Sequence, residues 1–321
     1  ASVKPVEQYR VVGRSMPRTD IPAKVAGELV FVHDKRLPGM LHGRVVRPPY
    51  AGADHGEFIG NTLEAVDDAS IAHIPGICAV VVIRDFVGIV AEREENAEWA
   101  ARELKVHWRD WPASPPLDDL ARAIADNPAT PRRLIDDGDV EQALGRAAQT
   151  LERQYLWPYQ MHASIGPSCA VAQWHGDSAP AGLAEAHAAA GDSTAAQEPT
   201  SAPALTVWSG TQNPHSLRAD LAVLLQLPAP AIEVVRMEAA GCYGRNGADD
   251  VTADAALLSR AVGAPVRVQL SREQENLWDP KGAAQLMNAR AGLDASGAIA
   301  AWDFETSYPS NAAPTLALLL T

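Results

Sequence analysis

The first hundred residues alternate apolar and polar positions in short runs that are typical of β-strands. Strand-like runs lie at residues 27–34, 40–47, 76–86 and 87–92. Residues 94–104 instead place apolar side chains at helical spacing, and another strand-like run follows at residues 105–108. The pattern therefore predicts a βαβ-like unit over residues 87–108, after a polar and loop-like start at residues 1–20.

A proline-rich patch at residues 112–116 is the best candidate for a boundary between domains. The elements expected after it are helices at residues 117–125 and 140–148 and strands at residues 149–157 and 168–174. Asp139 is a suitable N-cap for the second of these helices. Residues 176–204 are of low complexity and lack large apolar side chains, so we expect a mobile surface insertion there.

Two strand–loop–helix units then follow each other along the chain. The first runs from a strand at residues 205–209 to a helix at 214–226, and the second from a strand at 232–237 to a helix that ends at Val262. Asp249 or Asp250 is expected to cap the second helix, with Gly263 just past its end. A strand at residues 266–270 and a hairpin around residues 294–297 complete the pattern. This alternation predicts an α+β or α/β chain.

The loop of the second unit is rich in glycine. It reads Gly241-Cys242-Tyr243-Gly244-Arg245-Asn246-Gly247, between a strand and a helix. Glycine permits positive φ and close approach of the backbone N–H groups to a ligand, and a helix N-terminus favours an anion. Such a loop is often only a turn, so by itself this signal is weak.

Gln212 lies in the loop of the first unit, where it is either a turn or capping residue or a contact to a ligand. Both loops follow the carboxyl ends of strands, which is where the ligands of open α/β sheets bind. The two neighbouring loops together therefore strengthen the prediction of a binding site.

Composition narrows the class of protein. The 321 residues, 47% hydrophobic and with a net charge of −13, fit a globular protein of about two domains and disfavour nucleic-acid binding. No apolar run has the length of a membrane span, and no signal-peptide pattern is visible. The histidines show no metal-binding spacing, and the three cysteines form no CxxC pair, so we expect no iron–sulfur cluster in this chain. Cys78 and Cys169 lie in apolar runs and are expected in the core.

Several collinear segments carry a resemblance to a known family. They are TQNPHSLRADLAVLLQLP with IEVVRMEAAGCYGRNGADD, PRTDIPAKVAGELVFVHDKRLPGMLHGRVVRPP near the start, PYQMHASIGPSCAVAQW, and PVRVQLSREQEN. These segments resemble the molybdopterin-binding large subunits of the xanthine dehydrogenase/aldehyde oxidase family, in particular the branch that contains the β-subunits of isoquinoline 1-oxidoreductase. The resemblance implies an N-terminal extension at residues 1–19, an α/β-hammerhead domain at 20–113, and part of the first molybdenum-cofactor-binding domain at 114–321.

The same resemblance implies a role for particular residues. Gln212 would hydrogen-bond an oxo ligand of molybdenum. Backbone N–H groups from the glycine loop would surround the pterin dithiolene, which holds the metal without a direct protein ligand. The residues assigned to cofactor binding are Gln212, Gly241, Cys242, Tyr243, Gly244, Arg245 and Asn246. Three positions depart from the family pattern and alter the expected substrate pocket: Cys242, Tyr243 and Gly166.

The resemblance covers only part of a catalytic subunit. In the family the catalytic glutamate belongs to a C-terminal segment, so we expect no catalytic residue in this chain and a C-terminal segment or chain that completes the site. The implied enzyme oxidises an N-heteroaromatic or aldehyde substrate with water-derived oxygen.

The implied cofactor is molybdenum-molybdopterin in its cytosine dinucleotide form, with no haem in this chain. The implied partners are a small subunit with two [2Fe–2S] clusters and a cytochrome c subunit. Two alternatives stay open: a non-catalytic scaffold half of such a complex, and an unrelated phosphate- or nucleotide-binding module.

Overall fold

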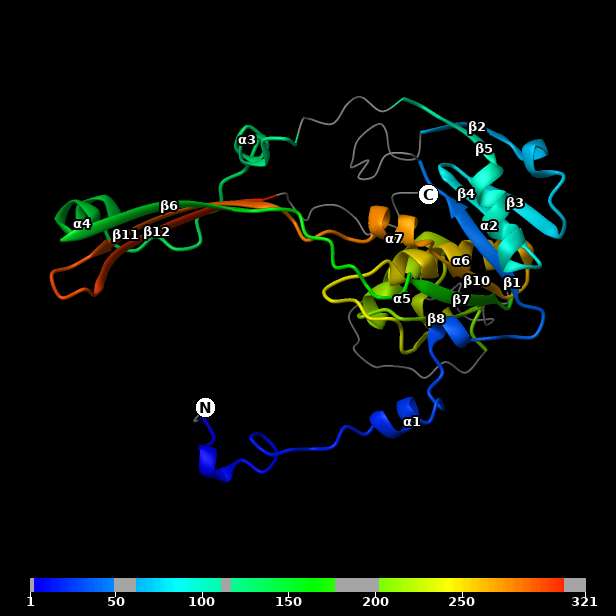
Figure 1. Cartoon of the computed structure of the whole chain (residues 1–321), viewed down its shortest axis with the longest axis horizontal. Coiled ribbons are helices and arrows are strands. Elements are labelled where there is room, and N and C mark those ends of the chain that lie inside the picture. Colours follow the sequence, from blue (N-terminus) through cyan, green and yellow to red (C-terminus); the bar gives the residue numbers. More distant parts are fainter. Residues whose placement is uncertain (1–2, 49–61, 111–116, 177–201, 309–321) are drawn as a thin grey trace, which may run out of the picture.

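A seven-stranded mixed sheet forms the main body of the computed structural model, which describes residues 3–48, 62–110, 117–176 and 202–308 (Figure 1). Its strands, in spatial order, are β3 (Ile77–Ile83), β4 (Phe86–Ala91), β1 (Leu41–Val46), β10 (Val266–Gln269), β7 (Cys169–Trp174), β8 (Leu205–Ser209) and β9 (Ile232–Arg236). The pairs β1–β10 and β8–β9 are parallel, and the other neighbours are antiparallel. The sheet therefore joins strands from both predicted domains.

Helices cover both faces of this sheet. On one face lie α5 (Pro214–Leu225) and α6 (Ala248–Val262), whose buried leucines share one core with the strands. The approach of α6 is close because β1 and β4 carry glycine beneath it: a Cβ on Gly43 or Gly88 would lie 2.7 or 2.5 Å from a methyl carbon of Leu258. The next residue of β1, Arg44, points to the opposite face, where α2 (Glu94–Glu103) packs.

An ion cluster anchors α2 to the sheet. Arg44 on β1 and Arg267 on β10 are each about 5% exposed and each donate to Glu94 Oε1 at 2.9 Å. Burial opposes the charge of Glu94, yet the two guanidinium groups lower the pKa of this carboxyl to about 2. The first turn of α2 is thereby held over the centre of the sheet.

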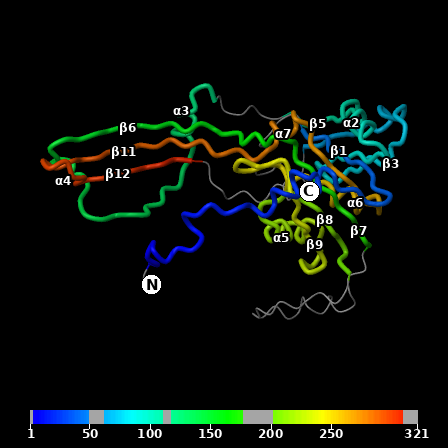
Figure 2. The backbone as a smooth tube through the Cα atoms, turned by 60° about the horizontal axis from the view of Figure 1, so that its bottom comes forward, coloured from blue at the N-terminus to red at the C-terminus, as the bar shows by residue number. Residues whose placement is uncertain are grey.

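Two smaller sheets complete the structure. A β-arm extends away from the main body in both views and consists of β12 (Ile299–Ser307), β11 (Gln285–Leu293) and β6 (Gln149–Trp157), with α3 (Leu120–Ala125) and α4 (Val140–Arg146) beside it (Figures 1 and 2). The second is the antiparallel pair of β2 (Leu63–Asp67) and β5 (Lys105–Trp108). A short helix, α1 (Ile21–Val25), precedes the sheet, and α7 (Arg272–Trp278) leads towards the β-arm.

Many of the predicted elements are confirmed. They include the two strand–loop–helix units, the hairpin β11–β12, the Asp139 cap of α4 and Gly263 at the end of α6 with φ +65°. Cys169 is buried, as expected. The residues 112–116 proposed as a domain boundary, and all but the ends of the insertion 176–204, lie outside the described residues.

Four local predictions are wrong. Residues 27–34 form only a single bridge, between Phe31 and Glu238, and then a 3-10 turn at Val32–Asp34. The βαβ-like unit does not exist, because β5 pairs with β2 rather than joining the sheet of β4. The side chains of Leu104 and Val106 pack into a separate small core there.

The third error concerns the ends of elements. Gly247, and neither Asp249 nor Asp250, is the N-cap of α6. The fourth error concerns Cys78, which lies on the edge strand β3 and is exposed rather than in the core. In the described ranges the fold is mixed α and β, as predicted, while the division into a hammerhead and a cofactor domain stays a prediction.

Candidate functional site

The two predicted loops meet at the edge of the main sheet. The strands β8 and β9 are parallel neighbours, so the loops after Ser209 and after Arg236 leave the sheet at the same end. Gln212 Nε2 in the first loop donates to Cys242 Sγ in the second at 3.0 Å. Gln212 and Cys242 are thus in direct contact although they are 30 positions apart in the sequence. Such a contact is what the prediction of one site formed by both loops requires.

Local hydrogen bonds leave the Gln212 side chain free to take this position. Asn213, the next residue, caps α5 by accepting from Ser216 N at 3.2 Å. Thr211 folds the turn by accepting from Asn213 N at 3.1 Å, and its own N–H donates to Ser209 Oγ at 3.1 Å. The turn and the cap are therefore made by its neighbours, and the exposed Gln212 amide contacts the glycine loop instead.

The glycine loop has the strained backbone that its composition predicts. Gly241, Tyr243 and Gly244 have φ values of +95°, +45° and +137°. None of the backbone hydrogen bonds in the described ranges is donated by an N–H group of residues 241–244. Asn246 closes the loop, because its amide donates to Gly241 O and accepts from Ala248 N, both at 3.1 Å. Among the described residues, these four consecutive N–H groups therefore meet no protein acceptor.

The other predicted residues of the loop lie at its surface. The side chain of Tyr243 is 63% exposed, and that of Arg245 is also exposed. The ring of Tyr243 lies beside Gly241, where a Cβ would be 3.2 Å from its Cε2. Gly241 and Tyr243 therefore pack on each other, and a larger residue at position 241 would displace the ring.

His162 forms a second wall beside the loop. A Cβ on Gly244 would lie only 2.3 Å from His162 Nδ1, so the half-buried imidazole rests directly against the Gly244 backbone. The turn that carries His162 is fixed at its far end, where His33 Nε2 is 2.8 Å from Pro167 O. No local pattern in the sequence indicates that His162 faces the glycine loop, which lies more than 75 residues further along the chain.

The sequence interpretation also missed α7, whose seven residues gave too short a pattern. Its Ser271 and Gln274 form a capping box, and Ser-x-x-Gln is the signal that would have revealed the helix. From this helix Glu275, 1% exposed, accepts hydrogen bonds from Ser168 N and Gly247 N.

Carboxylates surround the N-terminus of α6. Asp249 and Asp250 occupy its first turn, and Glu275 accepts from the N-cap Gly247. Burial raises the pKa of Asp249 and raises that of Asp250 to about 8. The N–H groups of Gly247 and Ala248 are both already bonded. A phosphate at this helix terminus would lie beside the carboxyl groups of Asp249, Asp250 and Glu275, which weighs against the alternative of a simple phosphate-binding module.

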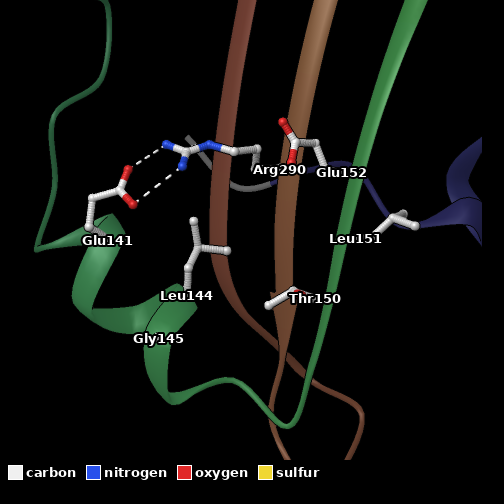
Figure 3. Close-up of a pocket in the computed structure, with 7 residues that line it drawn as sticks. All are labelled: Glu141, Leu144, Gly145, Thr150, Leu151, Glu152 and Arg290. Carbon is white, nitrogen blue, oxygen red and sulfur yellow. Dashed lines mark hydrogen bonds and ion pairs between the residues drawn. The ribbon is translucent and has the colours of Figure 1, made fainter.

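A pocket lies elsewhere, on the β-arm between α4 and the sheet (Figure 3). It is lined by Glu141, Leu144, Gly145, Thr150, Leu151, Glu152 and Arg290. Arg290 bridges Glu141 and Asp303, with its Nη2 at 2.5 and 2.6 Å from their oxygens. None of the residues expected to bind cofactor lines it. Across the described ranges, no group of three or more His, Cys, Asp or Glu is placed to hold a metal.

Comparison with known proteins gives the family. Residues 184–318, which include both loops, match the family model described as "Molybdopterin cofactor-binding domain". One of the subunits of nicotinate dehydrogenase from Pseudomonas putida is 61% identical, in a match that covers 100% of this chain and 25% of that protein. The chain belongs to the molybdopterin-binding large-subunit family. The family predicted from the sequence is thereby confirmed.

Two further relatives extend the comparison. The β-subunit of isoquinoline 1-oxidoreductase from Brevundimonas diminuta is 29% identical over 85% of this chain and 32% of its own length. The structure of the aldehyde oxidoreductase of Desulfovibrio gigas shares the fold with a TM-score of 0.69 and 19% identity, over 94% of this chain and 35% of that one.

The chain is thus similar to one part of a larger subunit, since it spans between 25% and 35% of the lengths of these three proteins. In the described ranges, no helix combines the length and apolar character that crossing a bilayer demands.

Proposed function

We propose that this chain contributes one wall of the molybdopterin site in the catalytic subunit of a molybdenum hydroxylase. The observation that carries the proposal is the contact of 3.0 Å between Gln212 Nε2 and Cys242 Sγ. It joins the two loops at the ends of parallel strands, where ligands of α/β sheets bind. The family match over residues 184–318 supports this choice of ligand.

The donors of this wall fit such a cofactor. The N–H groups of residues 241–244 make no hydrogen bond to other described groups, and the positive φ angles turn successive peptides into a concave backbone. An oxygen- and sulfur-rich ligand requires donors of this kind. When bound, the cofactor would supply the centre that accepts two electrons from the substrate.

Each residue of the wall has its own task in this proposal. Gln212 presents an amide N–H to an oxygen on the metal, and Cys242 Sγ orients that amide from the opposite loop. Gly241 to Gly244 approach the pterin closely, with Arg245 and Asn246 following them. Asn246 acts by closing the loop rather than by direct contact, since its side-chain amide is engaged at both ends.

For the whole enzyme, we propose oxidation of an N-heteroaromatic or aldehyde substrate with water-derived oxygen. The names of the two curated relatives, which concern nicotinate and isoquinoline, favour the N-heteroaromatic class. The catalytic glutamate would come from a C-terminal segment or chain. Electrons would leave through a small subunit with two [2Fe–2S] clusters towards a cytochrome c subunit, and the pterin would carry a cytosine dinucleotide.

Cofactor content tests the proposal. The chain is purified from a host that makes molybdopterin, alone and co-expressed with a polypeptide that corresponds to the rest of its 61% identical relative. Molybdenum is measured by elemental analysis and the pterin by fluorescence after oxidation. We expect both in the co-expressed complex and a loss of about tenfold in Gln212→Ala, because a hydrogen bond to a charged group is removed.

Two further variants sharpen the result. Cys242→Ala keeps the backbone donors and removes only the acceptor for Gln212, so its loss should be smaller, about two- to tenfold. Gln142→Ala, on the exposed surface of α4, is the matched control and should keep full cofactor content. A folded wild-type complex that binds no molybdenum would favour the alternative of a non-catalytic scaffold.

A further inference from the structure

Glu275 is a buried carboxylate that joins three segments around the candidate site. Its Oε1 accepts from Ser164 Oγ at 3.1 Å, from Ser168 Oγ at 3.0 Å and from Gly247 N at 3.3 Å. Its Oε2 accepts from Ser168 N at 2.7 Å. The side chain is 1% exposed and receives four donors, so its charge is compensated by hydrogen bonds rather than by water.

The helix that carries Glu275 is itself fixed at several points. Ser271 and Gln274 cap each other, and Gln274 Nε2 also donates to Val45 O on β1 at 2.8 Å. Arg272 Nη1 donates to Ser164 O at 2.8 Å. Consequently α7 is tied to the main sheet on one side and to the turn before β7 on the other, which gives Glu275 a defined position.

The segments that Glu275 ties together are the two that meet at Gly244. Ser164 lies two residues after His162, and Gly247 lies three residues after Gly244. His162 in turn lies so close to Gly244 that a Cβ there would be 2.3 Å from Nδ1. A shift of either segment therefore changes the contact between the imidazole and the loop.

We propose that Glu275 is a positioning residue that holds the glycine loop and the His162 turn in the relative position that the cofactor site requires. The identity of the ligand rests on the proposed function, whereas the positioning rests on the hydrogen bonds alone. All four partners of Glu275 are donors, and only a carboxylate accepts through both of its oxygens. An amide of the same shape would set an NH₂ group against Ser168 N–H or against the three donors at the other oxygen.

The test is the variant Glu275→Gln in the complex used for cofactor analysis, with amide hydrogen exchange and molybdenum content as separate measurements. We expect faster exchange by about tenfold or more at the bonded N–H groups of Ser168, Gly247 and Ala248, with no change in the β-arm. Molybdenum content should fall by about tenfold. Ser164→Ala, which removes one donor of four, should show a smaller change of the same kind and covers the case in which Glu275→Gln does not fold.

Two controls separate positioning from general destabilisation. Glu273→Gln makes the same chemical change on an exposed residue of the same helix and should behave as wild type. Val87→Ala removes two buried methyl groups from the small core beside α2 and should lower stability without loss of molybdenum from folded protein.

The outcomes are distinct. Unchanged exchange in both segments of Glu275→Gln overturns the positioning role, and so does full molybdenum content in a variant whose two segments exchange faster. A wild-type complex without molybdenum refutes the proposed function instead, and the exchange measurement alone then decides the role of Glu275.

Discussion

The contact between Gly244 and His162 gives the sharpest quantitative prediction. In Gly244→Ala the new Cβ would lie 2.3 Å from His162 Nδ1 and 2.6 Å from Cε1, well inside van der Waals contact. The backbone at this position also has φ +137°, a region that side chains rarely adopt. Conformational strain costs about 1–3 kcal/mol and overpacking about 1–3 kcal/mol, so we expect a loss of about 2–6 kcal/mol in the free energy of unfolding.

A double-mutant cycle separates the cost of backbone strain from the cost of overpacking against His162. His162→Ala alone removes only a half-buried contact and should cost less than about 1 kcal/mol. In the presence of His162→Ala, the substitution Gly244→Ala should lose its overpacking term and retain only the strain, so a coupling of about 1–3 kcal/mol is expected. Urea titration followed by tryptophan fluorescence, at fixed pH and salt, measures all four proteins of the cycle.

Gly297→Ala is the matched control. Gly297 also has a positive φ, +86°, but a Cβ there meets no atom within 4 Å. Its substitution should cost about 1–2 kcal/mol, and His162→Ala should not change that cost. If Gly244→Ala costs no more than Gly297→Ala, and if His162→Ala leaves that cost unchanged, then the imidazole does not rest on the loop and the second wall of the site does not exist.

Two predictions concern the dependence of stability on pH. Arg44 and Arg267 lower the pKa of Glu94 to about 2 in the folded state against an ordinary value of 4.5, so its stabilisation is present above pH 4.5 and is lost as the pH falls towards 2. Over that range, urea titrations should show that the free energy of unfolding falls by about 1–2 kcal/mol more in wild type than in Glu94→Gln. This value allows for solvent screening of a partly exposed carboxylate. Parallel pH profiles of the two proteins would contradict the role of the ion cluster. Burial raises the pKa of Asp250 from 3.8 to about 8, so the folded state favours the protonated carboxyl. The contribution of this group to folding stability is therefore complete below pH 3.8 and is lost as the pH rises to 8. The melting temperature of Asp250→Asn should therefore exceed that of wild type by an amount that grows from pH 5 to pH 8, whereas a constant difference would refute the assignment.

The sequence alone determined most elements near the candidate site. The strands β8 and β9 and the helices α5 and α6 are visible because their signals are local: apolar runs, Pro214 in the first turn and Gly263 after the last. Because the order strand–loop–helix occurs twice in succession, the sequence also predicted that Gln212 and the glycine loop lie at the same edge of the sheet. This inference held because consecutive parallel strands end on the same side.

The tertiary structure decided what surrounds those loops. Ser168 and Glu275 are 107 positions apart, and no local pattern marks a carboxylate that will be buried against donors from two other segments. The same holds for β5, which follows a helix as in a βαβ unit yet pairs with β2, because its apolar side chains complete a separate core. The N-cap of α6 is Gly247 rather than Asp249 or Asp250. The N–H group of Gly247 is bonded to Glu275, and this distant contact also has no local signal in the sequence.

Sequence periodicity records which face of an element is apolar, and capping residues record where it ends, so both can be deduced from a few neighbouring residues. The partner of a buried polar group depends on packing between distant segments, which the chain acquires only when it folds. The glycine loop itself was therefore predictable, whereas the walls formed beside it by His162 and behind it by Glu275 exist only in the folded chain.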